Sequence, residues 1–143
     1  MSVITPSVIS YLKQVAHGIY PTNVPVIRAG FVDAQKDTLF PMITVREDAG
    51  ESHPVFPASE TTVIVSVWVK GTDSEAFKKL VKTIGASVIS TLNKANVAMS
   101  SPSLIINFFS KTGGFPTWLP DEELWTYPIT FRAVYEEPPK NNS

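Results

Sequence analysis

The chain has 143 residues, enough for one domain, and a formal net charge of −1 from 12 basic and 13 acidic side chains. That balance excludes the basic surface on which unspecific nucleic-acid binding depends, and the absence of cysteine excludes disulfides and thiol chemistry. Hydrophobic residues make up 43% and charged residues only 17%, below the roughly 25% of typical globular domains, so we expect a surface that partner proteins cover in part.

The first third of the chain predicts a helix and two strands. Residues 6–17 carry apolar side chains at helical spacing, with Pro6 suited to the first position and Gly18 to the end. Residues 26–31 favour a short strand, and residues 41–47 alternate apolar and polar side chains as a second strand does. No basic start with an apolar run opens the chain, and no apolar run approaches the ~20 residues of a membrane span, so we expect no membrane association.

A long connection follows at residues 48–60 (DAGESHPVFPASE). Its prolines and small residues interrupt any period, and its place between two strands predicts a hairpin loop. Hairpin loops much longer than about five residues are uncommon and are usually functional or disordered. The centre of this loop carries His53, Val55 and Phe56. Apolar side chains at an exposed loop tip indicate contact with another protein.

The best-defined unit is a strand at 61–70 that runs into a helix at 73–95. Thr72 and Glu75 have the spacing of a capping box at the helix start, and Gly85 predicts a close approach to a neighbouring backbone. The helix has an apolar stripe that matches an apolar strand face, so the two pack as a helix on a sheet. Four alternating valines form that face: Val63, Val65, Val67 and Val69.

The remaining residues predict two strands, 104–110 and 124–136, separated by a second irregular loop at 111–123 (KTGGFPTWLPDEE). Pro128 cannot donate to a strand ladder, so it predicts a sheet edge or a bulge. Residues 138–143 are expected to be a flexible tail, which leaves 1–137 as a single domain. Together the elements predict an α+β fold of two layers, with a mostly antiparallel sheet and two helices on one face, in the order α-β-β-β-α-β-β.

No residue pattern supports catalysis. The two histidines, His17 and His53, stand apart in the sequence, and no metal-ligand spacing, nucleophile elbow or glycine-rich phosphate loop occurs. The acidic triplet Asp121, Glu122 and Glu123 is contiguous, and neighbouring side chains tend to diverge; a solvated turn is the simpler explanation. We therefore expect no enzyme activity, no metal and no cofactor.

The candidate site residues are instead those of an interface. Large aromatic side chains dominate interface energetics, and prolines lower the entropy cost of ordering a loop on binding. Folding back onto the core is the alternative for the loop aromatics. The candidates are two groups of loop residues and one residue on the strand face opposite the valines: His53, Val55, Phe56, Trp68, Phe115, Trp118 and Leu119.

In the layout of its elements the chain resembles the tail terminator and tail completion proteins of long-tailed bacteriophages. The resemblance rests on the short helix at 6–17, the strand at 41–45 (PMITV), the long hairpin loop, the strand at 62–70 that runs into the helix at 73–95, and the closing pair of strands. It covers nearly the whole chain. It contains no signature motif, so no functional residue is carried over from the family.

The resemblance implies a small α+β protein that forms a hexameric ring. Such a ring caps the finished tail tube, stops its polymerisation and joins the tail to the head connector, while DNA passes through without being read. The implied partners are further copies of the chain, the tail tube protein and a head-completion or connector protein. The implied location is the tail or neck of a virion, after assembly in the host cytoplasm. In such a ring we expect Asp121, Glu122 and Glu123 to line the lumen, where like charge keeps DNA from adhering.

Two alternatives stay open. The first is another ring protein of the neck or head–tail connector. A ferredoxin-like regulatory module that binds a small molecule would need polar groups on the free face of the sheet. Six residues are candidates for those groups: Thr44, Arg46, Ser66, Asn107, Thr130 and Arg132.

Overall fold

The computed structural model describes residues 4–15, 26–33, 36–47, 53–55, 58–93, 96–98, 105–110 and 114–136. The predicted α+β class and the order of the predicted elements are confirmed, and three further strands of three residues each are present, at His53–Val55, Asn96–Ala98 and Thr117–Leu119. The predicted tail at 138–143 lies outside the described residues. In chain order the elements are α1 (Ile4–Val15), β1 (Val26–Ala29), β2 (Met42–Glu47), β3 (His53–Val55), β4 (Ala58–Lys70), α2 (Glu75–Leu92), β5 (Asn96–Ala98), β6 (Ile105–Ser110), β7 (Thr117–Leu119) and β8 (Leu124–Glu136).

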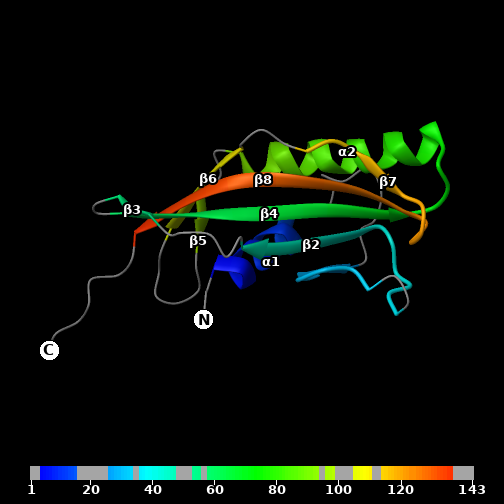
Figure 1. Ribbon diagram of the computed structural model, residues 1–143. Coiled ribbons are helices and arrows are strands. Elements are labelled where there is room, and N and C mark those ends of the chain that lie inside the picture. The colour runs from blue at the N-terminus through cyan, green and yellow to red at the C-terminus, as the bar shows by residue number, and fades with distance from the viewer. Residues whose placement is uncertain are drawn as a thin grey trace, which may run out of the picture.

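Two long strands form the spine of the sheet. β4 and β8 have 13 residues each and pair antiparallel along their whole length, from Ala58↔Glu136 to Lys70↔Leu124 (Figure 1). The strand order is β1-β2-β4-β8-β6-β5, while β3 pairs with β4 and β7 pairs with β8. All of these pairs are antiparallel except β1 with β2, which is parallel, so the predicted mostly antiparallel sheet is confirmed.

The core lies on one face of this sheet, beneath both helices. The alternation along β4 puts its valines there, and each buried valine contributes on the order of 1.5–3 kcal/mol. α1 contacts β1 and β2 and also β5 at the other end of the strand order, so the sheet curves around this helix. Besides the four valines of β4, the core contains Val8 and Leu12 of α1, Ile27, Ile43 and Val45 of β1 and β2, Val81, Ile84, Val88 and Leu92 of α2, and Trp125, Ile129, Phe131 and Ala133 of β8.

The predicted capping box at the start of α2 is wrong. The N-cap residue is Ser74, which makes no side-chain cap hydrogen bond, and the helix begins at Glu75. Thr72 lies before the helix, and its carbonyl oxygen accepts hydrogen bonds from the backbone N–H of Ser74 (2.8 Å) and from Nε1 of Trp125 (2.8 Å). The hydrogen bond from Trp125 joins the turn before α2 to the start of β8. A local sequence pattern around Thr72 cannot show this bond, because its donor lies 53 residues further along the chain.

Gly85 lies at a close approach, but the neighbour is a side chain and not a backbone. A Cβ atom built on Gly85 would lie 2.5 Å from Cε2 of Tyr127 on β8. Tyr127 is paired with Val67 in the sheet, so its ring lies on the helix-covered face. The glycine therefore lets α2 rest on an aromatic ring of the central sheet.

Both predicted irregular loops contain short strands. In the interval 48–60, β3 pairs with the first residues of β4 (His53↔Glu60, Val55↔Ala58), and β4 begins at Ala58, earlier than the predicted residue 61. In the interval 111–123, β7 pairs with β8 through Trp118↔Trp125, ahead of a turn in which Glu123 adopts a φ of 56°. Three-residue strands are too short to produce a detectable period, so the sequence does not show these short hairpins with the neighbouring ends of β4 and β8.

Pro128 lies inside the central strand β8, at a local break along one side of it. On that side β8 pairs with β7 through residues 124–126 and with β6 through residues 131–135. Between them the carbonyl oxygen of Pro128 accepts a hydrogen bond from the N–H of Gly114 (3.1 Å). In an antiparallel strand the N–H and C=O of one residue point to the same side. The missing N–H of Pro128 would therefore point into this break, where no strand partner among the described residues needs it.

Candidate functional site

The face of the sheet opposite α1 and α2, called here the helix-free face, carries the even-numbered residues of the central strands. The pairings Thr44↔Ser66, Ile64↔Thr130 and Thr62↔Arg132 place these residues on the same side. Five of the six polar residues proposed for this face therefore share it: Thr44, Arg46, Ser66, Thr130 and Arg132. The side chain of the sixth, Asn107, is not among those described.

Trp68 lies across this face and shields part of it. Its Nε1 donates a hydrogen bond to Oγ1 of Thr44 (2.9 Å), a diagonal contact between β4 and β2. Thr44 is 2% exposed and Ser66 6% exposed, although neither of the two described helices covers them. Trp68, predicted as an interface residue, is partly buried. Its indole N–H binds Thr44 within the chain, while part of the ring stays exposed on the helix-free face.

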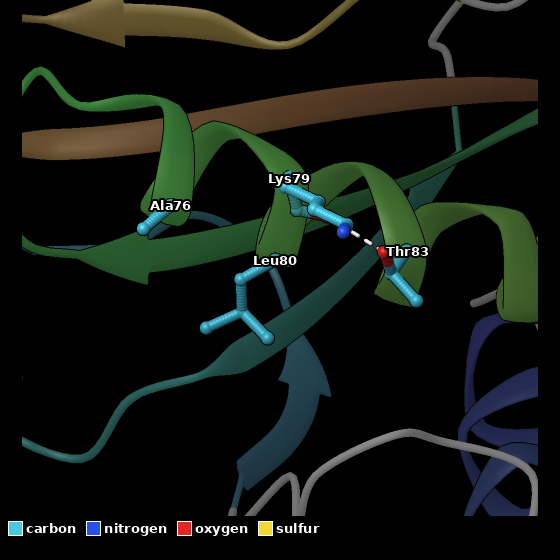
Figure 2. Close-up of a pocket in the computed structure, with 4 residues that line it drawn as sticks. All are labelled: Ala76, Lys79, Leu80 and Thr83. Atoms are coloured by element: carbon cyan, nitrogen blue, oxygen red, sulfur yellow. Dashed lines mark hydrogen bonds between the residues drawn. The ribbon is translucent and has the colours of Figure 1, made fainter.

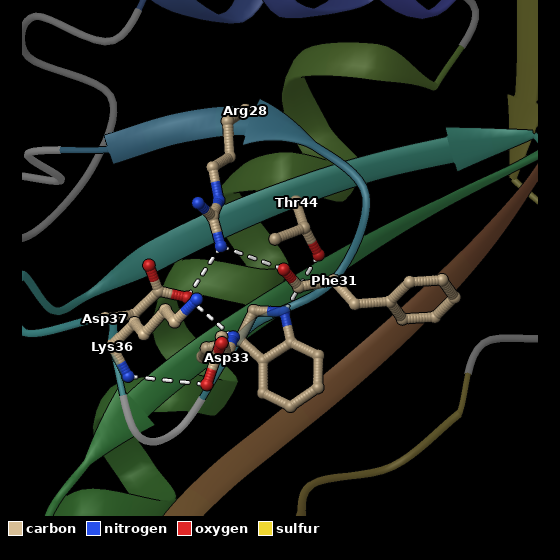
Figure 3. A network of polar contacts seen from close by, with 7 residues as sticks. Arg28, Phe31, Asp33, Lys36, Asp37 and Thr44 are labelled. Atoms are coloured by element: carbon tan, nitrogen blue, oxygen red, sulfur yellow. Dashed lines mark hydrogen bonds and ion pairs between the residues drawn. The ribbon is translucent and has the colours of Figure 1, made fainter.

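The connection from β1 to β2 is held by a polar network (Figure 3). Nη2 of Arg28 donates to Oδ2 of Asp37 (2.6 Å) and to the carbonyl oxygen of Phe31 (2.9 Å). Oδ2 of Asp37 also accepts from the N–H of Asp33 (2.6 Å), and the N–H of Gly30 donates to the carbonyl oxygen of Val45 (3.1 Å). Charge-assisted hydrogen bonds of this kind are stronger than neutral ones, so they hold the described residues of this connection in place.

The same connection carries two exposed apolar side chains that were not among the residues predicted from the sequence. Phe31 is 66% exposed and Leu39 57% exposed. The guanidinium carbon of Arg46 lies 4.9 Å from the centroid of the Phe31 ring, within cation–π range. The sequence feature that indicates exposure of Phe31 is its position after Gly30, just beyond a short strand. A large apolar side chain in a turn is far from the core and tends to stay exposed.

Two polar side chains of the helix-free face are engaged with neighbouring aromatic side chains. The hydroxyl of Thr44 is taken by Trp68, and Arg46 lies over Phe31. The face thus combines aromatic and arginine surface with shielded polar groups. That composition is typical of protein–protein contacts, in which aromatic residues and arginine are enriched.

The connection between β6 and β8 separates its three predicted interface residues. Trp118 packs against the core and lies 5.7 Å from the ring of Trp125 at an interplanar angle of 50°. Leu119 is also partly buried. Phe115, in contrast, is 74% exposed and directs most of its side chain to solvent.

The other candidates lie at the ends of the long strands. His53 and Val55 pair through their backbone with Glu60 and Ala58, while Phe56 lies outside the described residues. The acidic residues Asp121, Glu122 and Glu123 are exposed in the turn between β7 and β8. The carbonyl oxygen of Glu123 accepts a hydrogen bond from the N–H of Gly71 (3.2 Å), which places this turn beside the start of α2.

Within the part of the chain that the structure describes, no three histidine, aspartate or glutamate side chains come together as metal ligands would. Over the same residues, neither helix combines the length and the apolar character that crossing a membrane requires.

Comparisons with known proteins bear on the fold. No protein-family model matches the chain, and no curated protein matches its sequence. Among solved structures, a chain from the virion of a native gene transfer agent particle is similar, with a TM-score of 0.66 and 15% sequence identity. The superposition covers 94% of this chain and 95% of that chain. The protein therefore shares its fold, over nearly its whole length, with a chain of a gene transfer agent virion.

Proposed function

We propose that the protein is a structural component of a virion and that it acts by matching surfaces, without catalysing a reaction. The observation that carries the proposal is the fold shared with a virion chain over 94% of this chain and 95% of that one. Near-complete coverage of both chains means that the likeness concerns the whole molecule and not one common substructure. The low content of charged residues, 17%, supports a surface that partners cover in part.

Within this class, the specific role that we propose is that of a tail terminator. Copies of the chain form a ring, most simply a hexamer, which docks on the last ring of the tail tube, stops tube growth and joins the tail to the head connector. The element order supports this assignment because the chain has the long elements on which the resemblance to tail terminator proteins rests. Another ring protein of the neck is the nearest alternative, and it would bind the connector without stopping tube growth.

The helix-free face supplies a surface for the axial partner, the tail tube or the connector. Phe31 and Arg46 are of the residue types that dominate binding energy in interfaces, and they lie together. The Arg28–Asp37 ion pair holds their segment in shape before binding, which reduces the entropy cost of association. The surface is thus aromatic, basic at one point and preorganised.

The test is a tube-capping assay. Purified tail tube protein polymerises with and without this protein, and tube lengths are measured by negative-stain electron microscopy. We expect shorter tubes that carry a ring-shaped density at one end. Unchanged tube lengths, together with no binding to tubes at micromolar concentration, would overturn the terminator assignment. Binding to the connector alone would favour the neck alternative.

A further inference from the structure

Phe115 is an exposed aromatic side chain on a backbone that is fixed on both sides. The N–H of the preceding Gly114 donates to the carbonyl oxygen of Pro128 (3.1 Å), and Oγ1 of Thr117 donates to the carbonyl oxygen of Phe115 (3.1 Å). A Cβ atom on Gly114 would lie 2.8 Å from that Pro128 oxygen, so only glycine permits this close approach. The phenyl ring, which is 74% exposed, is therefore a preorganised knob.

The helix α2 carries a groove that fits such a knob. Ala76, Lys79, Leu80 and Thr83 line a hollow of about 260 Å³ on one flank of the helix (Figure 2). The hollow is open to solvent and is lined by one helix, so a partner side chain can reach it from outside. A phenyl ring can lie in it against the isobutyl group of Leu80.

Knob and groove lie on opposite flanks of the molecule. Figure 2 shows Leu80 pointing from α2 toward the side on which β2 and β1 run. Phe115 precedes β7, which pairs with β8 on the side away from β4, so it lies beyond the other flank of the spine. One chain cannot bring the two together. Two copies can, and a contact between different surfaces of identical chains closes into a ring when its rotation permits.

The charges on the two surfaces are complementary. The hairpin that follows Phe115 ends in the exposed residues Asp121, Glu122 and Glu123. Lys79 lines the groove itself, whereas Lys78 and Lys82 lie further round the same helix. Opposite charges of this kind orient the encounter of two copies and disfavour the pairing of like surfaces.

We propose that Phe115 of one copy inserts into the groove lined by Ala76, Lys79, Leu80 and Thr83 on α2 of the next copy. This contact is the repeating subunit interface of the ring, and it therefore rests on the proposed ring assembly. It places the acidic turn between subunits, on the side of Lys79 of the next copy, in place of the lumen position expected from the sequence.

The contact can be tested by thiol cross-linking, because the natural chain contains no cysteine. The variants Phe115→Cys and Ala76→Cys are purified separately, mixed and oxidised with diamide. We expect a covalent dimer on denaturing gels from the mixture only. The matched control replaces Ala76→Cys by Ala86→Cys, at an exposed residue of the same helix about 15 Å further along, and should give no dimer.

Two further variants measure the energetic weight of the contact. Phe115→Ala should weaken self-association at least about tenfold in sedimentation velocity experiments, as loss of an aromatic anchor does. Ala76→Trp should fill the groove and weaken self-association similarly, whereas Ala86→Trp should leave it unchanged. Circular dichroism melting curves check that each variant is folded.

The outcomes separate this inference from the proposed function. If the wild-type chain assembles, but Phe115→Ala assembles equally well and the Phe115→Cys and Ala76→Cys mixture forms no covalent dimer, the knob-and-groove contact is overturned and the ring assignment stands. If the wild-type chain stays monomeric at tens of micromolar, both alone and with tail tubes, both are overturned.

Discussion

At the residue scale, Gly85 shows how one missing methyl group allows a helix to rest on a sheet. In a helix interior, alanine is more favourable than glycine by about 1 kcal/mol. In this helix, however, an added Cβ would lie 2.5 Å from Cε2 of Tyr127, a ring that packs against the core. The steric cost of overpacking is typically about 1–3 kcal/mol and therefore outweighs the gain in propensity.

We therefore predict that Gly85→Ala lowers the free energy of unfolding by about 1–2 kcal/mol, measured by urea denaturation. The matched control is Gly85→Ala in a Tyr127→Leu background, where the smaller side chain leaves room for the methyl group. In that background the added Cβ should cost less than in the wild-type background, or should stabilise. A wild-type chain that becomes more stable on Gly85→Ala would show that α2 and β8 lie further apart than described.

The hydrogen bond from Trp68 to Thr44 gives a second prediction at this scale. It lies on a face without helices, yet its acceptor Thr44 is only 2% exposed, so water cannot easily replace the donor. A double-mutant cycle of Trp68→Phe and Thr44→Val should give a coupling energy of about 0.5–1.5 kcal/mol in urea denaturation. Strictly additive effects would mean that the contact contributes nothing to stability.

At the element scale, the start of α2 shows a difference between the contact that a local sequence pattern predicts and the contact that the fold makes. The side chain of Thr72 is exposed, and its carbonyl oxygen, which any residue supplies, accepts the two hydrogen bonds at this site. Replacing a functional N-cap typically costs about 1 kcal/mol. The structure contains no such side-chain cap, so the site has little to lose on truncation of Thr72.

We predict that Thr72→Ala changes the free energy of unfolding by less than about 0.5 kcal/mol, since the side chain is exposed and caps nothing. Trp125→Phe, which removes the donor to the Thr72 carbonyl, should cost about 1 kcal/mol or more, because Trp125 is 5% exposed. Both are measured by thermal and urea denaturation. A loss near 1 kcal/mol for Thr72→Ala would restore the capping box that the sequence suggests.

At the scale of the whole molecule, the exposed aromatic residues fall on different sides. Phe31 and Arg46 lie on the helix-free face, whereas Phe115 lies beyond the β8 flank of the spine. A ring needs one kind of contact between its copies and another along its axis. Two separate surfaces satisfy that requirement, and so substitutions on them should have separate effects.

We predict that the double variant Phe31→Ala and Arg46→Ala weakens binding to tail tubes at least about tenfold and leaves self-association unchanged. Co-sedimentation with tubes and sedimentation velocity measure the two properties on the same preparation. Lys13→Ala, at an exposed position of α1, is the control and should change neither. Loss of self-association in the double variant would assign the helix-free face to contacts between copies.

The sequence alone determined the elements that are long enough to show a period. The valines of β4, the apolar stripe of α2 and the odd-numbered residues of β8 repeat over many residues, and burying one face is the only way to remove such a stripe from water. From these elements the two-layer α+β class and the side on which both helices lie were correctly predicted, as was the position of Trp68 on the opposite face.

Only the tertiary structure decided the rest, because the remaining features rest on single pairings and hydrogen bonds that leave no period in the sequence. The strands β3 and β7 exist through pairing with β4 and β8, and Pro128 is tolerated in a central strand because β6 and β7 leave a break beside it. Phe31 and Phe115 likewise stay in solvent because the network around Arg28 and the bond from Gly114 hold their backbones outward. Some of these contacts join residues only a few positions apart, but each is a single contact, and a single contact produces no repeating pattern that the sequence alone would show.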